Sequence, residues 1–189
     1  MALDITLTVL FLIFLWQMEV WIREIRQKNR QCKAAVGYCQ KHHKLLLVAG
    51  GPWGGRNWRR RFNMPAHISG DVNIDIRASA IVGHPNGVVA NVVKLPFPDK
   101  TFGAAFASHL LEHLPDAAQA KAALVELERV ADVVCIAYPS RQSIVAWIIT
   151  DHRLWVWQKG NMVYLQQRRK TEKPNKIEHH ELISTEGSL

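Results

Sequence analysis

Four short stretches between Gly50 and His113 contain the residue types that bind a nucleotide-like ligand. The first is AGGPWGG (49–55), whose glycines lack Cβ and tolerate positive φ, so that its backbone can approach a ligand closely. Amides at the start of a following helix could then meet an anion or a carboxylate. Asp75 lies 24 residues after Gly51, near the spacing at which a carboxylate accepts from both hydroxyls of a ribose. The alternative role of Asp75 is to cap the next helix.

The remaining two stretches are Asn91–Leu95 and SHLLEH (108–113). An imidazole titrates near neutral pH, so His109 or His113 could remove a proton from an acceptor hydroxyl or carbon acid. The competing interpretation is structural. In it, His113 hydrogen-bonds a loop, and Glu112 caps a helix or faces solvent.

Five apolar runs alternate with helical patterns, and this alternation predicts a parallel βαβ sheet. A helix is predicted over DAAQAKAALVELERVA (116–131), with Asp116 as its N-cap. In an open, doubly wound sheet with right-handed crossovers, ligands bind beyond the carboxyl ends of the strands. The four stretches follow strands and are therefore expected to meet at one edge. The predicted strands occupy residues 44–50, 72–76, 87–93, 102–108 and 132–139.

Three further segments are predicted beyond the fifth strand. QSIVAWIITDHRLWVWQ (142–158) predicts another helix, and NMVYLQQRR (161–169) predicts a final strand. The stretch 169–189 lacks hydrophobic periodicity and is expected to be a flexible tail.

The segment ITLTVLFLIFLWQMEVWI (5–22) is the most apolar part of the chain and predicts one N-terminal transmembrane helix. At about 1.5 Å per residue it would be about 27 Å long, close to the thickness of a hydrocarbon core. Trp16 and Trp21 suit an interfacial belt, and the basic stretch REIRQKNRQCK (23–33) follows. The positive-inside rule then places the N-terminus outside and the domain on the cytoplasmic side of the membrane, as a single-pass protein. The alternative is a soluble helix that packs against a partner.

The net charge of +8 is divided among separate basic spots, without the basic–aromatic platform of an RNA-binding sheet. A nucleic-acid partner is therefore not favoured, and anionic lipid headgroups account equally well for the spot that follows the apolar segment. Three cysteines are too few for a disulfide framework. Cys32, Cys39, His42 and His43 match no strong zinc pattern, so no metal site is predicted.

The segment LPFPDKTFGAAFASHLLEHLPD (95–116) resembles the class I S-adenosylmethionine-dependent methyltransferases. The most similar group is methyltransferase-11-like and includes quinone-biosynthesis and other small-molecule methyltransferases. That family has a Leu-Pro-Phe-Pro-Asp loop, a Phe-Asp strand and a Ser/His–Leu–Glu–His segment that opens a helix. The resemblance covers Leu45 to Pro139. It implies an α/β, doubly wound, Rossmann-like methyltransferase sheet, here shortened at its C-terminal end, with S-adenosylmethionine as cofactor.

The resemblance also implies a role for each candidate residue. The glycines would form the loop under the methionine part of the cofactor, Asp75 would bind the ribose, and Asn91 would contact the adenine amino group. His109 and His113 are the candidate catalytic residues, although catalysis in this family is mostly placement of the acceptor in line with the sulfonium. The implied cofactor-binding residues are Gly50, Gly51, Gly54, Asp75, Ile76, Asn91 and Ser108.

Several positions depart from the family pattern. Leu47 stands where the first-loop acid is usual, Ala49 where the first glycine is usual, and Gly103 replaces the aspartate of the Phe-Asp strand. Asn91 likewise replaces an acid, and each lost charge-assisted contact can weaken cofactor binding about tenfold to a hundredfold.

Two functions remain open. One is a membrane-anchored S-adenosylmethionine-dependent methyltransferase acting on a small or lipid-associated acceptor. The other is a catalytically inactive methyltransferase-fold subunit of a membrane protein complex, in which cofactor binding is weak or lost. In either case the expected organisation is a transmembrane anchor (1–23), a basic juxtamembrane helix or linker (24–43), a methyltransferase-like domain (44–168) and the tail (169–189).

Overall fold

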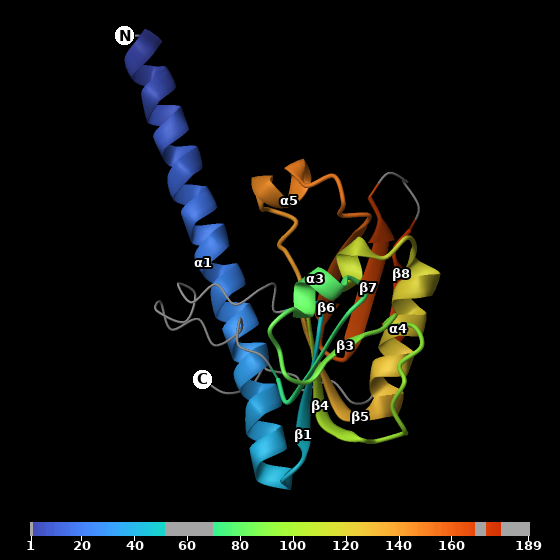
Figure 1. Cartoon of the computed structure of the whole chain (residues 1–189). Coiled ribbons are helices and arrows are strands. Elements are labelled where there is room, and N and C mark those ends of the chain that lie inside the picture. Colours follow the sequence, from blue (N-terminus) through green and yellow to red (C-terminus); the bar gives the residue numbers. More distant parts are fainter. Residues whose placement is uncertain (1, 52–69, 169–172, 179–189) are drawn as a thin grey trace.

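The computed structural model describes residues 2–51, 70–168 and 173–178 (Figure 1). At its centre is a five-stranded parallel sheet with the strand order β3-β2-β1-β4-β5. All five predicted strands are present, although β3 is shorter than predicted because the chain turns at an isolated bridge between Asn91 and Lys94. The strands are β1 (Leu45–Ala49), β2 (Val72–Asp75), β3 (Gly87–Val89), β4 (Phe102–Ser108) and β5 (Ala131–Ala137).

The two faces of this sheet are covered by different elements, and the alternation of side chains along β1 shows the division. Leu46 and Val48 pack in one apolar cluster with residues of α1 (Ala2–His42). Leu47 and Ala49 pack in a second cluster with α4 (Ala117–Val130) on the opposite face. Because consecutive strand residues point to opposite faces, both faces of β1 are buried, as in other parallel sheets.

Helix α1 is continuous through the predicted anchor and the segment predicted as a juxtamembrane helix or linker. In Figure 1 its first half extends away from the sheet and its second half lies along it. Cys32, Ala35 and Cys39 are buried against the sheet. Burial raises the pKa of both thiols, which suits their role as small packing groups. Residues 24–43 are therefore also a structural layer of the domain.

Gly103 on β4 lies in close contact with the end of α1 and with Lys44, which follows that helix. A Cβ added to this glycine would lie 2.7 Å from Cβ of Lys44 and 3.3 Å from Sγ of Cys39. The family's aspartate would not fit at this position. The departure at residue 103 thus has a packing reason, which is the close contact with the helix that precedes β1.

The prediction of a helix over residues 142–158 is wrong. Only α5 (Ile144–Ile148) is helical, and the chain then continues as β6 (Leu154–Lys159). Aromatic and β-branched residues favour a strand when a partner is present, and β6 pairs antiparallel with β7 (Met162–Gln167). The rings of Trp157 and Tyr164 stack across this pair with centroids 5.2 Å apart.

A second sheet of order β6-β7-β8 completes the described part of the fold. β7 agrees with the predicted final strand, whereas β8 (Asn175–Glu178) lies inside the segment predicted as a tail. The prediction of a tail is wrong for residues 175–178, which pair antiparallel with β7. The local sequence has no pattern that reveals this pairing. Leu154, Val163 and Ile177 join the apolar cluster on the α4 face. The parallel sheet itself ends at β5 among the described residues, as the expected C-terminal shortening implies.

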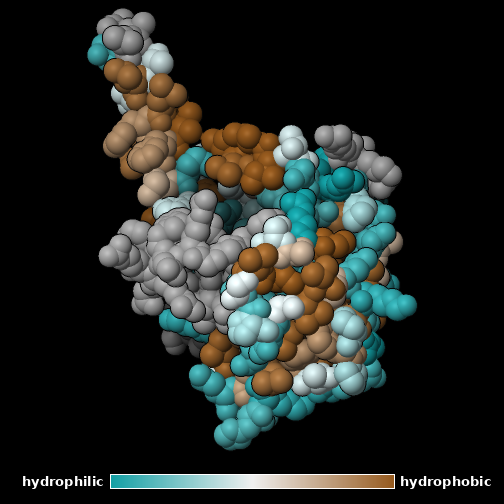
Figure 2. Space-filling model, in the orientation of Figure 1, coloured by the Kyte–Doolittle hydropathy of each residue, from teal (hydrophilic) through white to brown (hydrophobic). Residues whose placement is uncertain are grey.

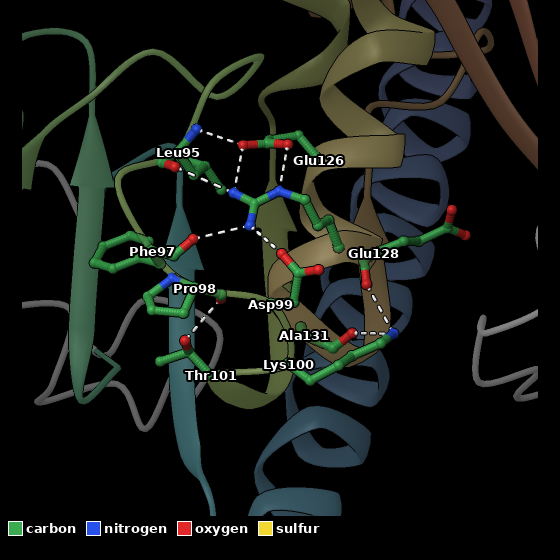
Figure 3. A network of polar contacts seen from close by, with 10 residues as sticks. Leu95, Phe97, Pro98, Asp99, Lys100, Thr101, Glu126, Glu128 and Ala131 are labelled. Atoms are coloured by element: carbon green, nitrogen blue, oxygen red, sulfur yellow. Dashed lines mark hydrogen bonds and ion pairs between the residues drawn. The ribbon is translucent and has the colours of Figure 1, made fainter.

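The Leu-Pro-Phe-Pro-Asp loop before β4 is held by Arg129 of α4 (Figure 3). The guanidinium donates to the carbonyl oxygens of Leu95 and Phe97, at 3.2 and 2.9 Å. It also pairs with the carboxylates of Asp99 and Glu126, at 2.6 and 2.7 Å. Hydrogen bonds to these two carboxylates raise the pKa of Arg129, and the bond from Arg129 lowers the pKa of Glu126. Arg129 therefore fixes the conformation of this loop and, through it, the start of β4.

Replacement of Gly103 by Ala is expected to lower the free energy of unfolding by about 1–3 kcal/mol, because the new methyl group overpacks the contact with Lys44 and Cys39. The measurement is chemical denaturation of the purified protein in detergent. Gly37→Ala is the matched control, since a Cβ at this position of α1 meets nothing within 4 Å and alanine favours a helix. Equal stability of G103A and wild type would contradict the packing argument.

Candidate functional site

A cavity of about 510 Å³ lies at the carboxyl ends of the parallel strands. It is formed where the strand order reverses between β1 and β4, which is the usual ligand position in such sheets. Its volume is in the range of small-molecule sites. The predicted site residues that line it are Gly50, Asp75, Ile76, Asn91, His109 and His113.

Gly50 and Gly51 follow β1 with positive φ angles of 92° and 107°. A Cβ on Gly50 would lie 3.0 Å from the carbonyl oxygen of Ser108 and 3.2 Å from Cβ of Leu110. This position therefore requires glycine for its backbone conformation and for the close approach of β4. Gly51 is buried beside it but does not line the cavity. Gly54 lies outside the described residues.

Asp75 ends β2 and lines the cavity. Its Oδ1 accepts a hydrogen bond of 2.8 Å from the backbone N–H of Arg77. The short helix α3 (Ala78–Ile81) has Arg77 as its N-cap, so Asp75 is not the cap residue. The carboxylate instead closes a tight turn and keeps acceptor capacity for a ligand. Ile76, next to it, is 68% exposed and forms an apolar part of the cavity wall.

Asn91 lines the cavity from the segment after β3. Its Oδ1 accepts from the backbone N–H of Val93 at 3.2 Å, and the carbonyl of Asn91 accepts from Lys94 at 2.9 Å. A carbonyl oxygen has two lone pairs, so Oδ1 can accept a second hydrogen bond. An amide at this position can thus replace one of the contacts that an acid would make.

His109 is held in place by its backbone and by Glu112. It has a φ of 51°, and its N–H donates to the carbonyl oxygen of Ala137 at 2.9 Å. Its ring nitrogen Nδ1 lies 3.2 Å from Oε1 of Glu112. Ser108 precedes it at the end of β4, is buried, and does not line the cavity. The structure thus brings His109 to the cavity, while the predicted cofactor contact of Ser108 has no geometric support.

His113 lies at the end of the 3₁₀ turn η2 (Leu111–His113), and its ring meets that of His152 with centroids 4.9 Å apart. Glu112, in the same turn, is fully buried, so the interpretation that it faces solvent is wrong. Burial lowers the pKa of His152 below its ordinary value, against the opposing attraction of Glu112. A buried imidazole and a buried carboxylate therefore lie beside His113.

Four polar residues of the cavity wall were missed by sequence reasoning: Arg77, Gln119, Asp151 and Arg153. Asp151 and Arg153 lie in the segment that was predicted as a helix, which concealed their position between α5 and β6. The backbone N–H of Arg153 donates to the carbonyl oxygen of Glu112 at 2.7 Å, and this bond brings the segment to the cavity. A strand prediction for residues 154–159 would have placed both residues in a loop.

Leu47 is fully buried in the apolar cluster under α4 and does not reach the cavity, whereas Ala49 lines it. The usual first-loop acid thus has no replacement at the corresponding strand position. Trp53 and Arg56 of the same glycine-rich segment lie outside the described residues.

The methyltransferase-11 family model, described as a methyltransferase domain, matches residues 70–133. The matched segment contains Asp75, Asn91 and the stretch 95–116, and it begins after the glycine stretch 49–55. The sheet is that of a class I methyltransferase. The resemblance to the methyltransferases seen in the sequence is thereby confirmed. The family match covers residues 70–133 and does not include the altered first loop.

Two solved structures are similar to this chain. The PH0226 protein of Pyrococcus horikoshii OT3 is 13% identical, with a TM-score of 0.43 over 80% of this chain and 74% of that one. The magnesium protoporphyrin IX methyltransferase of Synechocystis PCC 6803, solved with bound S-adenosylmethionine, is 15% identical, with a TM-score of 0.38 over 78% of this chain and 76% of that one. The sequence has no significant match among curated proteins.

Replacement of Gly50 by Ala is expected to cost about 1–3 kcal/mol of folding free energy from backbone strain, and to narrow the cavity by displacing Ser108 or Leu110. Gly83 is the matched control, because it has a φ of 83° but open space around its Cβ position. Chemical denaturation should therefore show a lower free energy of unfolding for both G50A and G83A, with the larger decrease for G50A. Equal losses would show that the close approach at Gly50 is not tight.

Proposed function

We propose that this chain is a membrane-associated S-adenosylmethionine-dependent methyltransferase that acts on a small or lipid-associated acceptor. The observation that supports it most is the cavity at the strand ends, which brings Gly50, Asp75 and Asn91 together beside two histidines. The methyltransferase family match covers two of these three residues.

The residues of the cavity suit the ribose, the adenine and the methionine part of S-adenosylmethionine. The Asp75 carboxylate would accept from the ribose hydroxyls, and Ile76 and Asn91 would contact the adenine. The backbone at Gly50 and Gly51 would pass under the methionine part. Bound S-adenosylmethionine supplies a methyl group on a sulfonium, and the protein has chiefly to place the acceptor. His109 and His113 would orient the acceptor or take its proton.

Membrane association is supported by the exposure of α1. Ile5, Phe11, Phe14 and Trp16 are 46–59% exposed, although they belong to the most apolar part of the chain. Within the described residues, α1 is the one helix long and apolar enough to cross a membrane. Figure 2 shows this apolar surface on the part of the helix that projects from the domain. Such a surface in water would be unfavourable unless a lipid or protein covers it.

The exposed apolar stretch 5–16 is about 18 Å long, shorter than a hydrocarbon core of about 30 Å. From Gln17 onward the helix is engaged with the domain. The Gln17 amide donates to the carbonyl oxygen of Gln142 at 3.1 Å and accepts from the N–H of Ile144 at 2.9 Å. If α1 inserts, the region around α5 must therefore lie at the membrane interface.

The surface of α5 suits that position. Val145 and Ile148 are 64% and 70% exposed, and Trp147 beside them is 56% exposed. Arg168 places its guanidinium over the ring of Trp147 at 5.6 Å, so that a cation accompanies the aromatic surface, as in a headgroup contact. In Figure 2 the apolar patch over α5 faces the same end of the molecule as the apolar part of α1.

Access for a lipid-associated acceptor follows from the order of the chain. Asp151 and Arg153 line the cavity and come directly after α5. An acceptor in the interface would therefore need to travel only along this short segment to reach the cavity. The basic residues after the apolar segment favour an orientation with the domain on the cytoplasmic side.

The alternative function is an inactive methyltransferase-fold subunit of a membrane protein complex. The observation that favours it is the full burial of Leu47, which leaves the first strand without a carboxylate for the cofactor. In that case a partner protein would cover the apolar surfaces of α1 and α5. Cofactor binding separates the two functions.

Titration calorimetry with S-adenosylmethionine is expected to show binding that Asp75→Asn weakens by roughly tenfold or more. Asparagine keeps an acceptor for the N–H of Arg77 but removes the charge, so the turn should survive. The control is Asp132→Asn, which removes a carboxylate paired with Lys44 at the opposite end of the sheet and should leave affinity unchanged. Absence of binding at millimolar cofactor would favour the inactive subunit.

Hydrogen exchange of the full chain should show slower exchange of α5 amides when the protein is bound to anionic phospholipid vesicles than when it is free of detergent and of added lipid. A double variant, Val145→Ser and Ile148→Ser, is expected to lose this protection, because it removes exposed apolar area. Val125→Ser is the matched control, since Val125 is a 53% exposed valine on α4. Protection that persists in the double variant would argue against α5 as a membrane contact.

A further inference from the structure

Glu112, His113 and His152 form a cluster at the wall of the cavity. One ligand atom from each, a carboxylate oxygen or an imidazole nitrogen, lies within 4.8 Å of the other two. Glu112 and His113 come from the turn after β4, and His152 comes from the segment before β6. The bond from the N–H of Arg153 to the carbonyl oxygen of Glu112 holds these two segments together.

Two of the three residues have buried polar atoms without a partner. Among the described residues, neither Oε2 of Glu112 nor Nδ1 of His152 has a hydrogen-bond partner. Glu112 is 0% exposed and His152 is 7% exposed. An unsatisfied buried polar atom destabilises the fold, and a charged one destabilises it more. Two such atoms in one cluster indicate that a ligand belongs between them.

The surrounding groups also indicate that this ligand is a cation. His109 occupies Oε1 of Glu112, which leaves Oε2 for another partner. A second carboxyl group, that of Glu24 in α1, lies near enough for Glu112 to raise its pKa, although burial is the larger cause. The imidazole of His152 is buried and is hydrogen-bonded to the backbone of Ala146. Imidazole nitrogens and carboxylate oxygens are both common ligands of transition-metal ions.

We propose that Glu112, His113 and His152 form a binding site for a divalent transition-metal ion. Two imidazoles and one carboxylate favour zinc-like or iron-like ions over Mg²⁺ and Ca²⁺, which prefer oxygen ligands. Bonds of about 2.0–2.2 Å in a tetrahedral site place ligand atoms about 3.4 Å apart, so binding requires the three ligand atoms, now within 4.8 Å of one another, to move closer together. The exposed ring of His113 can make this adjustment by rotation. His109 then positions the carboxylate of Glu112 through the other oxygen.

The site goes beyond the proposed methyltransferase function and does not depend on it. When His113 binds the ion, His109 would be the residue that takes a proton from the acceptor. Three protein ligands leave at least one coordination position open, as in catalytic zinc sites. Because His113 lines the cavity, a water or an acceptor oxygen could occupy that position. The ion would lower the pKa of a bound hydroxyl and fix its place.

The test is titration of the metal-stripped, full-length protein in detergent with Co²⁺ alone, without S-adenosylmethionine. One Co²⁺ per chain is expected, with the visible absorption of a four- or five-coordinate ion, and Zn²⁺ should displace it. His113→Gln, His152→Gln and Glu112→Gln should each weaken binding by at least about tenfold. His113→Gln changes an exposed side chain, so it tests the site even if the buried variants do not fold.

His42→Gln is the matched control, since His42 is an exposed histidine at the end of α1 that stacks on Tyr38. It should leave Co²⁺ affinity unchanged. Failure of the wild type to bind one Co²⁺ per chain would overturn the proposal, as would binding that is equally tight in His113→Gln. Because the cofactor is absent from this titration, its result is independent of whether S-adenosylmethionine binds.

Discussion

The packing of the second half of α1 on the parallel sheet is the interaction on which the rest of the structure depends. Cys32, Ala35 and Cys39 cover the face of the sheet that α4 leaves open. Parallel sheets are stable only when both faces are covered, so this helix is required for the fold itself. Since the same helix continues into the exposed apolar segment, that apolar surface and the domain are joined by a continuous helix rather than by a flexible linker.

This arrangement also fixes the position of the cavity. Gln17 and Glu24 of α1 bond to backbone groups at residues 140–144, so the segment after β5 is tied to the helix. That segment leads through α5 to Asp151 and Arg153 in the cavity wall. The orientation of the apolar helix and the position of the cavity wall are therefore coupled.

The chain combines family-like and altered parts, and the structure gives a physical reason for one alteration and for one retained motif. Gly103 replaces an acid because Cys39 of α1 and Lys44 leave too little space for a Cβ at this position. Arg129 holds the Leu-Pro-Phe-Pro-Asp loop through Asp99 and Glu126, which explains why this motif is kept although it does not line the cavity. Leu47 is different, since its burial explains its apolar character but not how the cofactor would be held without an acid.

The sequence by itself determined the five parallel strands, the helix capped by Asp116 and the strand ends that carry Asp75, Asn91 and His109. These features depend on local periodicity and on the rule that ligands bind at the carboxyl ends of parallel strands. Only the tertiary structure decided that residues 154–159 form a strand and that Glu112 and His152 meet behind His113. Strand pairing with β7 overrides the local helical pattern, and the two segments are joined by a backbone bond between residues distant in the chain. Such contacts leave no periodic signal in the sequence.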